Sequence, residues 1–437
     1  SDPAMRTAEL EGPRRRFVQR FQQLSGPAAA KGVEDTAFYV YVPLLSRDEV
    51  GGAPGAPVTR AAGDLHAANL HRADCWPHTM LTVTTHDTKR SADVRARLDV
   101  LSELPDEWEG CVYRWRRLNR RHRALVGGRR LPDANTEWLL YQTLVGAWPL
   151  ELLPPEEAGV LDVDALAAFR ERIAEYAQKA AREAKAHTSW VDPDPEFEGA
   201  LDRFVERVLS IGAAGDFLAE LTRFVRRIAR AGLWNAVSRT VAQLASPGVP
   251  DIYQGDELWT FSLVDPDNRR PVDFDRRRTM LEDIAERFGD PDRRPALLRA
   301  MVEAPEDGRL KLHVTHRLLA ARRADPALFV GGAYHPVAAR GRHGGQVFAF
   351  GRRNGSGAAL AIVPRLWARR LAPPAYLPPD AAAWGDTHVA LPPALPGGRW
   401  TDALTGSSFL LDDAHVPVGP LLERLPVTLL LAESAHR

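Results

Sequence analysis

Residues 80–91 read MLTVTTHDTKRS, a short run of apolar and β-branched residues followed at once by polar ones. Such a run predicts a buried β-strand. His86 and Asp87 come directly after the run, and in (β/α) barrels the catalytic groups gather at the C-terminal ends of the strands. We therefore expect a polar site at this strand end. The same residues also fit a helix start in which Asp87 or Ser91 caps free backbone amides, and the local sequence leaves both interpretations open.

A long helical region separates this strand from a second one. From about residue 92 to 245 the apolar residues recur at helical spacing, interrupted by turns rich in Pro and Gly. Within it, residues 217–244 carry an apolar stripe that fits one long helix, or two if Gly232 divides it. Residues 248–257, GVPDIYQGDE, then predict a short buried strand with a polar end. A turn-rich loop built on Gly and Pro accounts for the same residues.

The C-terminal part of the chain has a different character. Short apolar runs at 347–350, 359–363 and 427–431 are separated by Asn354-Gly355 and by clusters of Pro and Gly. Asn-Gly between two such runs is typical of a β-hairpin, so the pattern predicts an antiparallel β sandwich. The chain as a whole is expected to be α+β. We expect four domains, which span residues 1–91 with the site loops, 92–245 as a helical insertion, 246–325 with the second strand and a helix, and 326–437 as the β domain.

Composition excludes several classes of function. The 57 Lys and Arg residues balance the 57 Asp and Glu residues, so no long-range field favours nucleic acid as a partner. Cys75 and Cys111 are too few for a disulfide framework and lack metal-ligand spacing, which favours a cytoplasmic setting without a metal or a cofactor. The sequence has no long apolar run and no leader-like start, so we expect no membrane partner. The opening residues SDPAM are typical of a tag remnant, and we expect a longer natural chain.

A further group of polar and aromatic residues lies near the start of the chain. Residues 31–39 read KGVEDTAFY and place Lys31, Glu34 and Asp35 close to Phe38 and Tyr39. Charged groups that bond hydroxyls beside aromatic rings that stack on pyranoses suit a sugar site. An ordinary solvated loop is the alternative, since charged residues are usually exposed.

Taken together, these segments resemble a known family. Residues 85–97 (THDTKRSADVRAR) and 263–274 (LVDPDNRRPVDF), with 31–39, are similar to maltooligosyltrehalose synthases of the α-amylase clan. Weaker similarity runs through 139–149 and 185–190, so the resemblance covers the chain from about residue 14.

The resemblance implies a fold, an activity and a set of site residues. The fold would be the last part of a (β/α)8 barrel with a large helical insertion, followed by the β sandwich. The activity would be the isomerisation of the reducing-end α-1,4 bond of a maltooligosaccharide to an α,α-1,1 bond in trehalose biosynthesis. Asp87 would be the carboxylate that stabilises the transition state. The residues implied to bind the substrate are His86, Lys89, Arg90, Lys31, Glu34, Asp35, Phe38, Tyr39 and Tyr253.

The sequence departs from the family pattern at its centre. A retaining enzyme of this clan needs a nucleophile and an acid about 5 Å apart, and nothing before His86 resembles either of them. We therefore expect most of the barrel to be missing, this chain to be inactive alone, and its partner to be the N-terminal barrel portion of the same enzyme. A trehalohydrolase would be its neighbour in the pathway. Two alternatives stay open, a noncatalytic glucan-binding or structural module and a sister trehalohydrolase, although residues 31–39 and 87–97 argue against the hydrolase.

Overall fold

Two short parallel strands lie where the sequence predicted the polar site to begin. In the computed structural model, which describes residues 3–55, 62–153, 160–355, 357–412 and 414–433, β1 (Met80–Leu81) pairs with β4 (Val249–Pro250). Gly248 permits this close approach, because its φ is 118° and a Cβ there would stand 2.8 Å from the carbonyl oxygen of Thr79. Since the strands are parallel, the loops that follow them leave from the same end of the pair.

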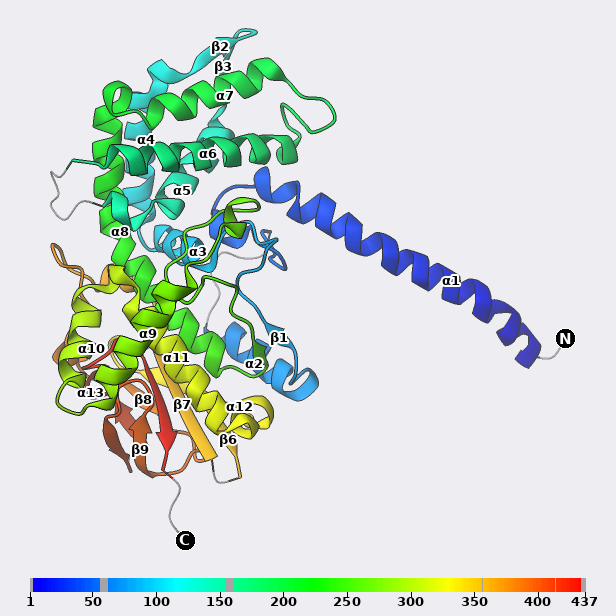
Figure 1. Cartoon of the computed structure of the whole chain (residues 1–437). Helices are drawn as coiled ribbons and strands as arrows, with labels where there is room; N and C mark the ends of the chain where they lie inside the picture. Colours follow the sequence, from blue (N-terminus) through cyan, green and yellow to red (C-terminus); the bar gives the residue numbers. More distant parts are fainter. Residues whose placement is uncertain (1–2, 56–61, 154–159, 356, 413, 434–437) are drawn as a thin grey trace. The chain divides into compact units, whose positions relative to one another are not determined.

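The chain divides into two units built from interleaved ranges (Figure 1). Unit 1 consists of Ser1–Gly55, Trp115–Leu144 and Val163–Leu218, and unit 2 of Ala56–Arg114, Val145–Asp162 and Ala219–Arg437. The sequence predicted four consecutive domains instead, and that division stays a prediction. The mixture of helices and an antiparallel sheet is as predicted.

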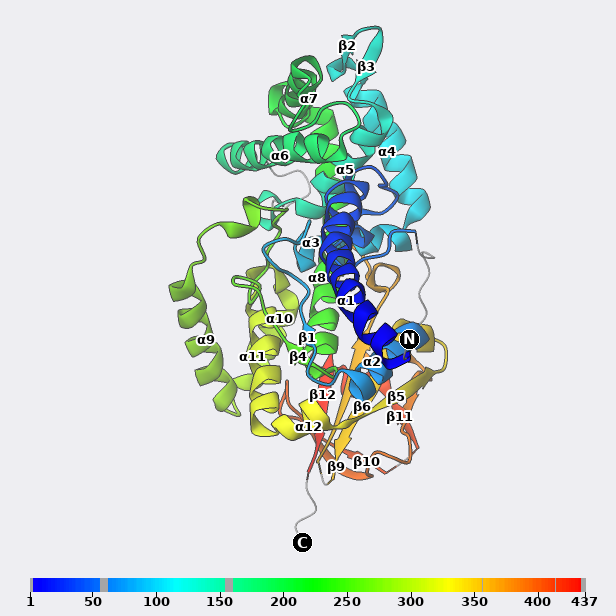
Figure 2. The same ribbon diagram turned by 90° about the vertical axis from the view of Figure 1, so that its right-hand side faces the viewer.

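Unit 1 is helical apart from one hairpin. The helices α6 and α7 run side by side in both views (Figures 1 and 2). Its elements are α1 (Pro3–Ala29), α6 (Val163–Ala184), α7 (Pro195–Val208), the hairpin strands β2 (Ala124–Val126) and β3 (Arg129–Leu131), and the single turns η1 (Ala30–Glu34), η2 (Ala37–Tyr39), η3 (Leu45–Arg47) and η5 (Arg120–His122). Three helices contribute residues to both units, namely α4 (Pro105–Asn119), α5 (Ala134–Ala147) and α8 (Ile211–Ala245).

Residues 217–244 form one continuous helix within α8, which is the first of the two alternatives that the sequence left open. Its backbone leaves helical geometry at Ala214, where φ is −136°, and it passes through Gly232 without a break. Gly232 has another role. A Cβ at this position would stand 2.8 Å from the Cα of Arg97 in α3 (Ala92–Asp99), so glycine lets α3 and α8 pack closely within unit 2.

The C-terminal strands form one continuous antiparallel sheet in the order β10-β9-β12-β7-β6-β5-β8-β11. The sequence predicted a sandwich of two sheets instead. The sheet is continuous because β5 pairs with β6 through residues 333–337 and with β8 through residues 338–340. The strands are β5 (Ala333–Arg340), β6 (Val347–Asn354), β7 (Gly357–Pro364), β8 (His388–Ala390), β9 (Gly398–Asp402), β10 (Ser408–Leu411), β11 (His415–Pro417) and β12 (Thr428–Ala432).

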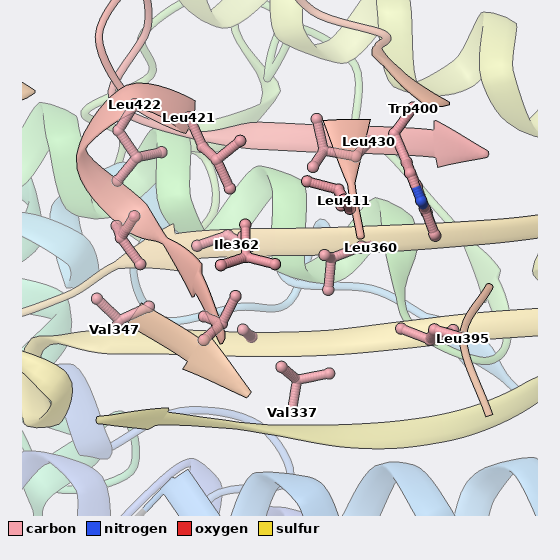
Figure 3. Packing of buried hydrophobic residues seen from close by; sticks show 14 of the residues in the cluster. Val337, Val347, Leu360, Ile362, Leu395, Trp400, Leu411, Leu421, Leu422 and Leu430 are labelled. Carbon is pink, nitrogen blue, oxygen red and sulfur yellow. The ribbon is translucent and has the colours of Figure 1, made fainter. Parts of the chain in front are cut away.

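A hydrophobic cluster fills the space that this sheet encloses. Ile362 and Leu360 of β7, Leu430 of β12, Trp400 of β9 and Val337 of β5 all belong to it, and Figure 3 shows their side chains gathered between the strands. The strands β6 and β7 are buried along nearly their whole length, because helix α12 (Pro326–Gly331) also packs against both of them. This double burial explains why their sequences are continuous apolar runs and do not alternate.

The remaining elements of unit 2 surround the strands described above. They are the helices α2 (Ala62–Cys75), α9 (Phe274–Gly289), α10 (Arg294–Glu303), α11 (Arg309–Ala324), α12 (Pro326–Gly331) and α13 (Val418–Leu421), with the single turns η4 (Val100–Glu103), η6 (Leu150–Leu152), η7 (Asp267–Arg269), η8 (Pro305–Asp307), η9 (Gly344–Gln346), η10 (Trp367–Arg369) and η11 (Ala381–Trp384). Among the described residues, none of the helices combines the length and the hydropathy needed to cross a membrane.

His313 links α11 to the β domain. Its Nε2 lies 2.8 Å from the carbonyl oxygen of Leu404, and the side chain is fully buried. Burial lowers the pKa of His313 from 6.5 to about 4. The folded state therefore binds a proton less readily than the unfolded chain does.

This difference predicts a loss of stability in acid. Lowering the pH from about 6.5 to 4 should reduce the free energy of unfolding by about 3 kcal/mol, because the unfolded chain gains the proton first. Above pH 6.5 the group should have no effect. Urea denaturation at pH 7 and pH 4.5 measures the loss, which His313→Gln should reduce and the exposed control His78→Gln should not. Equal pH dependence in both variants would rule out His313 as the cause.

Candidate functional site

The turn after β1 is closed by its own threonine side chains. The hydroxyl of Thr88 donates to the carbonyl of Thr85 at 2.9 Å, and it accepts the N–H of Thr85 at 3.2 Å. The N–H of Asp87 donates to the hydroxyl of Thr85 at 3.1 Å. These bonds within residues 85–88 give the His86–Asp87 peptide a defined turn, which the alternation of Thr with polar residues made possible.

Of the two candidate caps for the following helix, Ser91 is the one observed. Its side-chain oxygen accepts the N–H of Val94, and Thr84 accepts the N–H of Ala92 at 3.1 Å. Asp87 takes no part in capping α3. Its carboxylate is therefore not used by the helix and is available for a ligand.

Exposure separates the residues of this turn into two pairs. His86 and Asp87 are exposed, whereas Lys89 is 1% exposed and Arg90 is fully buried. The ammonium group of Lys89 lies 3.6 Å from Oδ1 of Asp87, whose side chain is 58% exposed. A carboxylate that faces solvent thus has a buried ammonium group behind it.

Asn268 holds the turn from the other side. Its side-chain amide donates to the carbonyl oxygens of Thr85 at 3.3 Å and of His86 at 3.0 Å. It lies in η7, where Asp267 accepts the N–H of Leu263 at 2.7 Å. The segment 263–274 that resembled the family therefore contacts the His86–Asp87 turn through Asn268, which acts as a positioning residue for that turn.

A buried carboxylate connects the loop after β4 to three helices. Asp93 of α3 is 2% exposed, and its Oδ2 lies 2.7 Å from Nζ of Lys311 in α11 and accepts the N–H of Thr260 at 2.9 Å. Its Oδ1 lies 3.1 Å from Nη2 of Arg239 in α8. Burial raises the pKa of Asp93, but the charges of Lys311 and Arg239 outweigh this effect and hold the pKa below its usual range. Asp93 is thus ionised inside the protein.

Asp256 lies beside this cluster, and its pKa is shifted in the opposite direction, upward. Burial raises its pKa, and the charge of Asp93 adds to the rise while Lys311 opposes it. Asp256, Asp251, Lys311 and Thr315 line a cavity of about 20 Å³, which is enough for about one ordered water. Across the described ranges of the chain, no three side chains of the His, Cys, Asp and Glu types gather as metal ligands would.

The segment 31–39 belongs to unit 1, and its two aromatic rings are buried while Lys31 is exposed. Lys31 forms an ion pair with Asp35 at 2.5 Å, and Glu34 accepts the N–H of Gly51 at 3.2 Å. Phe38 and Tyr39 are 1% and 3% exposed. The structure thus leaves no open aromatic face at either ring for a sugar, and their role in binding substrate stays a prediction.

The predicted site residues therefore fall into two sets, one in each unit. Residues 31–39 lie in unit 1, whereas His86, Asp87, Lys89, Arg90 and the half-buried Tyr253 lie in unit 2. Sequence reasoning missed Asp93, Lys311 and Asn268. Asn268 and Asp93 lie inside the segments that carried the family resemblance, so the sequence indicated their region but not their contacts. Nothing in the sequence around Lys311 indicated a role for it.

Removing the Asn268 side chain should loosen the turn. Asn268→Ala deletes two hydrogen bonds worth about 1 kcal/mol each, so we expect up to about thirtyfold faster amide exchange at residues 85–88 with little change in β6 and β7. Hydrogen exchange followed by mass spectrometry measures this. The control is Asn135→Ala, which removes a bond to the carbonyl of Val40 in unit 1. Unchanged exchange at 85–88 would contradict a positioning role.

Removing the cation beside Asp93 should destabilise unit 2. Lys311→Met leaves the carboxylate without its closest charged partner, and breaking such a buried pair costs about 3–5 kcal/mol. The double variant with Asp93→Asn removes both charges and should recover part of this loss. Chemical denaturation of the wild type, the single and the double variants measures the free energies of unfolding. A double variant less stable than Lys311→Met would argue against a charge effect.

Comparison with known proteins finds the same family in sequence and in structure. No family model matches the chain. A protein of Mycobacterium tuberculosis, provisionally described as a maltooligosyl trehalose synthase, is 37% identical over 416 residues, which are 95% of this chain and 46% of that protein. The solved maltooligosyltrehalose synthase of Arthrobacter ramosus is 38% identical, with a TM-score of 0.71 over 94% of this chain and 46% of that one. A hypothetical maltooligosyl trehalose synthase of Sulfolobus tokodaii is 26% identical, with a TM-score of 0.65 over 94% of this chain and 47% of that one.

These matches run along nearly all of this chain, which in turn spans about half the length of the relatives. The segments 85–97 and 263–274 that carried the resemblance are also the segments that meet at the His86–Asp87 turn. By sequence and by fold, this chain is a homologue of the maltooligosyltrehalose synthases, corresponding to a portion of their length.

Proposed function

We propose that this chain supplies a transition-state-stabilising carboxylate, Asp87, to a maltooligosyltrehalose synthase. The observation that carries the proposal is the exposed Asp87 side chain on a turn that Asn268 holds, with the buried Lys89 behind it. A carboxylate that accepts hydrogen bonds from ring hydroxyls binds more strongly as the sugar becomes cationic, because those hydroxyls become more acidic. His86, exposed beside it, would bond the same sugar ring.

The reaction that we propose is an intramolecular transglucosylation. The terminal α-1,4 bond at the reducing end of a maltooligosaccharide is cleaved, and the released glucose attacks the same glucosyl carbon through its anomeric hydroxyl to form an α,α-1,1 bond. A nucleophile and an acid about 5 Å apart are needed for the covalent steps. We infer that the portion of the relatives which this chain does not span supplies both groups, and that this chain alone is inactive.

In this proposal the other predicted site residues differ in whether they would contact the sugar or support residues that do. Lys31, Glu34 and Asp35 would bond sugar hydroxyls, and Tyr253 would line the pocket near the end of β4. Lys89 and Arg90 are buried, so they would orient Asp87 from behind. Phe38 and Tyr39 would act by supporting their segment. A cytoplasmic setting, which the free thiols of Cys75 and Cys111 favour, is part of the same proposal.

One observation bears on the alternative functions. The relatives reported above carry synthase names at 37% and 38% identity, which favours the synthase over the sister trehalohydrolase. A noncatalytic glucan-binding or structural module is the other alternative, and the following experiment tests it.

The chain alone should fail to convert maltopentaose to its trehalosyl isomer. Enzymes lower barriers by about 8 kcal/mol or more, and a stabilising carboxylate without a nucleophile or an acid does not supply this. Addition of the portion of the Arthrobacter ramosus synthase that this chain does not span should restore turnover, as chromatography of the products would show.

The matched variants identify the group responsible. Asp87→Asn should lower the restored rate by about a hundredfold or more, whereas Asp275→Asn, whose side chain is 87% exposed in α9, should leave it unchanged. Turnover by the isolated chain would overturn the proposed division of roles. A mixture that stays inactive although the two parts associate would favour the noncatalytic module.

A further inference from the structure

A tryptophan is exposed on an ordered loop of unit 1 that the proposed function does not use. The loop of residues 185–194 connects α6 to α7, and Trp190 within it is 55% exposed next to Val191, which is 95% exposed. Tryptophan is highly buried on average in folded proteins. Trp76 is exposed as well, at 65%, so what distinguishes Trp190 is the way in which its ring is held.

The loop is fixed at both ends and in its middle. Lys185 ends α6 with φ of 55°, and Asp194 caps α7 by accepting the N–H of Glu196 at 3.0 Å. Between them, the hydroxyl of Thr188 donates to Glu198 at 2.7 Å, and His187 lies 2.9 Å from Asp133. The loop therefore presents Trp190 from a stable frame.

The tip of the loop is a tight turn that closes on itself. The N–H of Ser189 donates to the carbonyl of Asp192 at 3.0 Å, and the N–H of Asp192 donates to the hydroxyl of Ser189 at 2.9 Å. Trp190 and Val191 stand between these two residues. They are the apolar tip of an otherwise polar loop.

The indole itself has one fixed orientation. Its Nε1 donates to Glu183 at 3.0 Å, and the guanidinium of Arg182 lies over one face at 4.9 Å from a ring centre. Arg182 is in turn held by two hydrogen bonds to Glu198, at 2.8 and 2.7 Å. One face of the indole is thus covered and its N–H is satisfied, so the exposed area belongs to the opposite face.

We propose that the open face of Trp190 is a stacking platform for a glucosyl ring of an α-1,4-glucan. A flat ring with a satisfied polar edge stacks on the apolar face of a pyranose, and a ring that is already fixed loses little entropy on binding. Lys185, five residues before Trp190, also donates to Thr36 at 3.3 Å, so this loop contacts the 31–39 segment within unit 1.

The choice of an α-1,4-glucan rests on the proposed function, since the platform alone selects a sugar ring and not a linkage. A protein surface that covers Trp190 and Val191 together is the competing occupant. The platform would lie on a different unit from the His86–Asp87 turn. It can therefore be tested by binding alone, without turnover.

The experiment compares the migration of the full chain in native gels with and without soluble amylose, and titrates it with maltoheptaose by calorimetry. Trp190→Ala should weaken glucan binding by about tenfold, which corresponds to the loss of one stacked ring. Trp190→Phe should retain most of it, because the ring stays. Trp76→Ala is the matched control, since Trp76 of unit 2 is 65% exposed and follows α2. Circular dichroism and the thermal midpoint verify that all variants are folded.

The outcomes separate this proposal from the proposed function. Binding by Trp190→Ala at the wild-type level, or an equal loss in Trp76→Ala, overturns the platform even if the mixture with the synthase portion turns over. Loss of binding in Trp190→Ala with an inactive mixture supports the platform while the proposed function fails. If the wild-type chain does not bind glucan but Trp190→Ala weakens its association with the synthase portion, a protein covers Trp190 and the platform is overturned.

Discussion

The ionised carboxylate of Asp93 is the constraint on which the site in unit 2 depends. A charge without access to water is stable only with partners around it, so Asp93 requires α3, α8, α11 and the loop after β4 to stay in one arrangement. The same loop also contacts the His86–Asp87 turn. In this loop the carbonyl of Ser262 accepts the N–H of Ser91, and the side-chain amide of Asn268 donates to the carbonyl of His86. These bonds set the position of the turn.

Local patterns of the sequence predicted the features whose cause is local. The Asn354-Gly355 hairpin appears where it was predicted, with Gly355 at φ of 41° between β6 and β7. The strand before His86 appears as well, although only Met80–Leu81 pair as β-structure. Ser91 and Asp87 were equal candidates for the helix cap, because either side chain can accept a backbone N–H and only the path of the chain decides between them.

Features with a distant cause could not be predicted in this way. Gly232 looked like a possible helix end, but its function is to admit the backbone of Arg97, which is far away in the sequence. The single sheet in place of a sandwich follows from β5 pairing with two neighbours, and strands as short as β8 leave no periodic signal. In residues 31–39 the rings of Phe38 and Tyr39 are buried, whereas Trp190, an exposed ring of unit 1, lies outside that motif. The residue types alone therefore predicted a composition suited to a sugar site, but not which of the aromatic rings are exposed.

The exposure of Asp87 limits the role that this carboxylate can have in the proposed reaction. In the reaction proposed above, its effect on an oxocarbenium-like transition state would be the same whether water or glucose is the acceptor, because the charge that it would stabilise has already developed. Isomerisation requires that the released glucose turns and attacks before water does, so the site must be closed to water during that step. With 58% of its side chain exposed, Asp87 provides no such closure. Under the proposed function, the preference for a trehalosyl product would therefore arise from other groups, which the portion of the relatives that this chain does not span would supply.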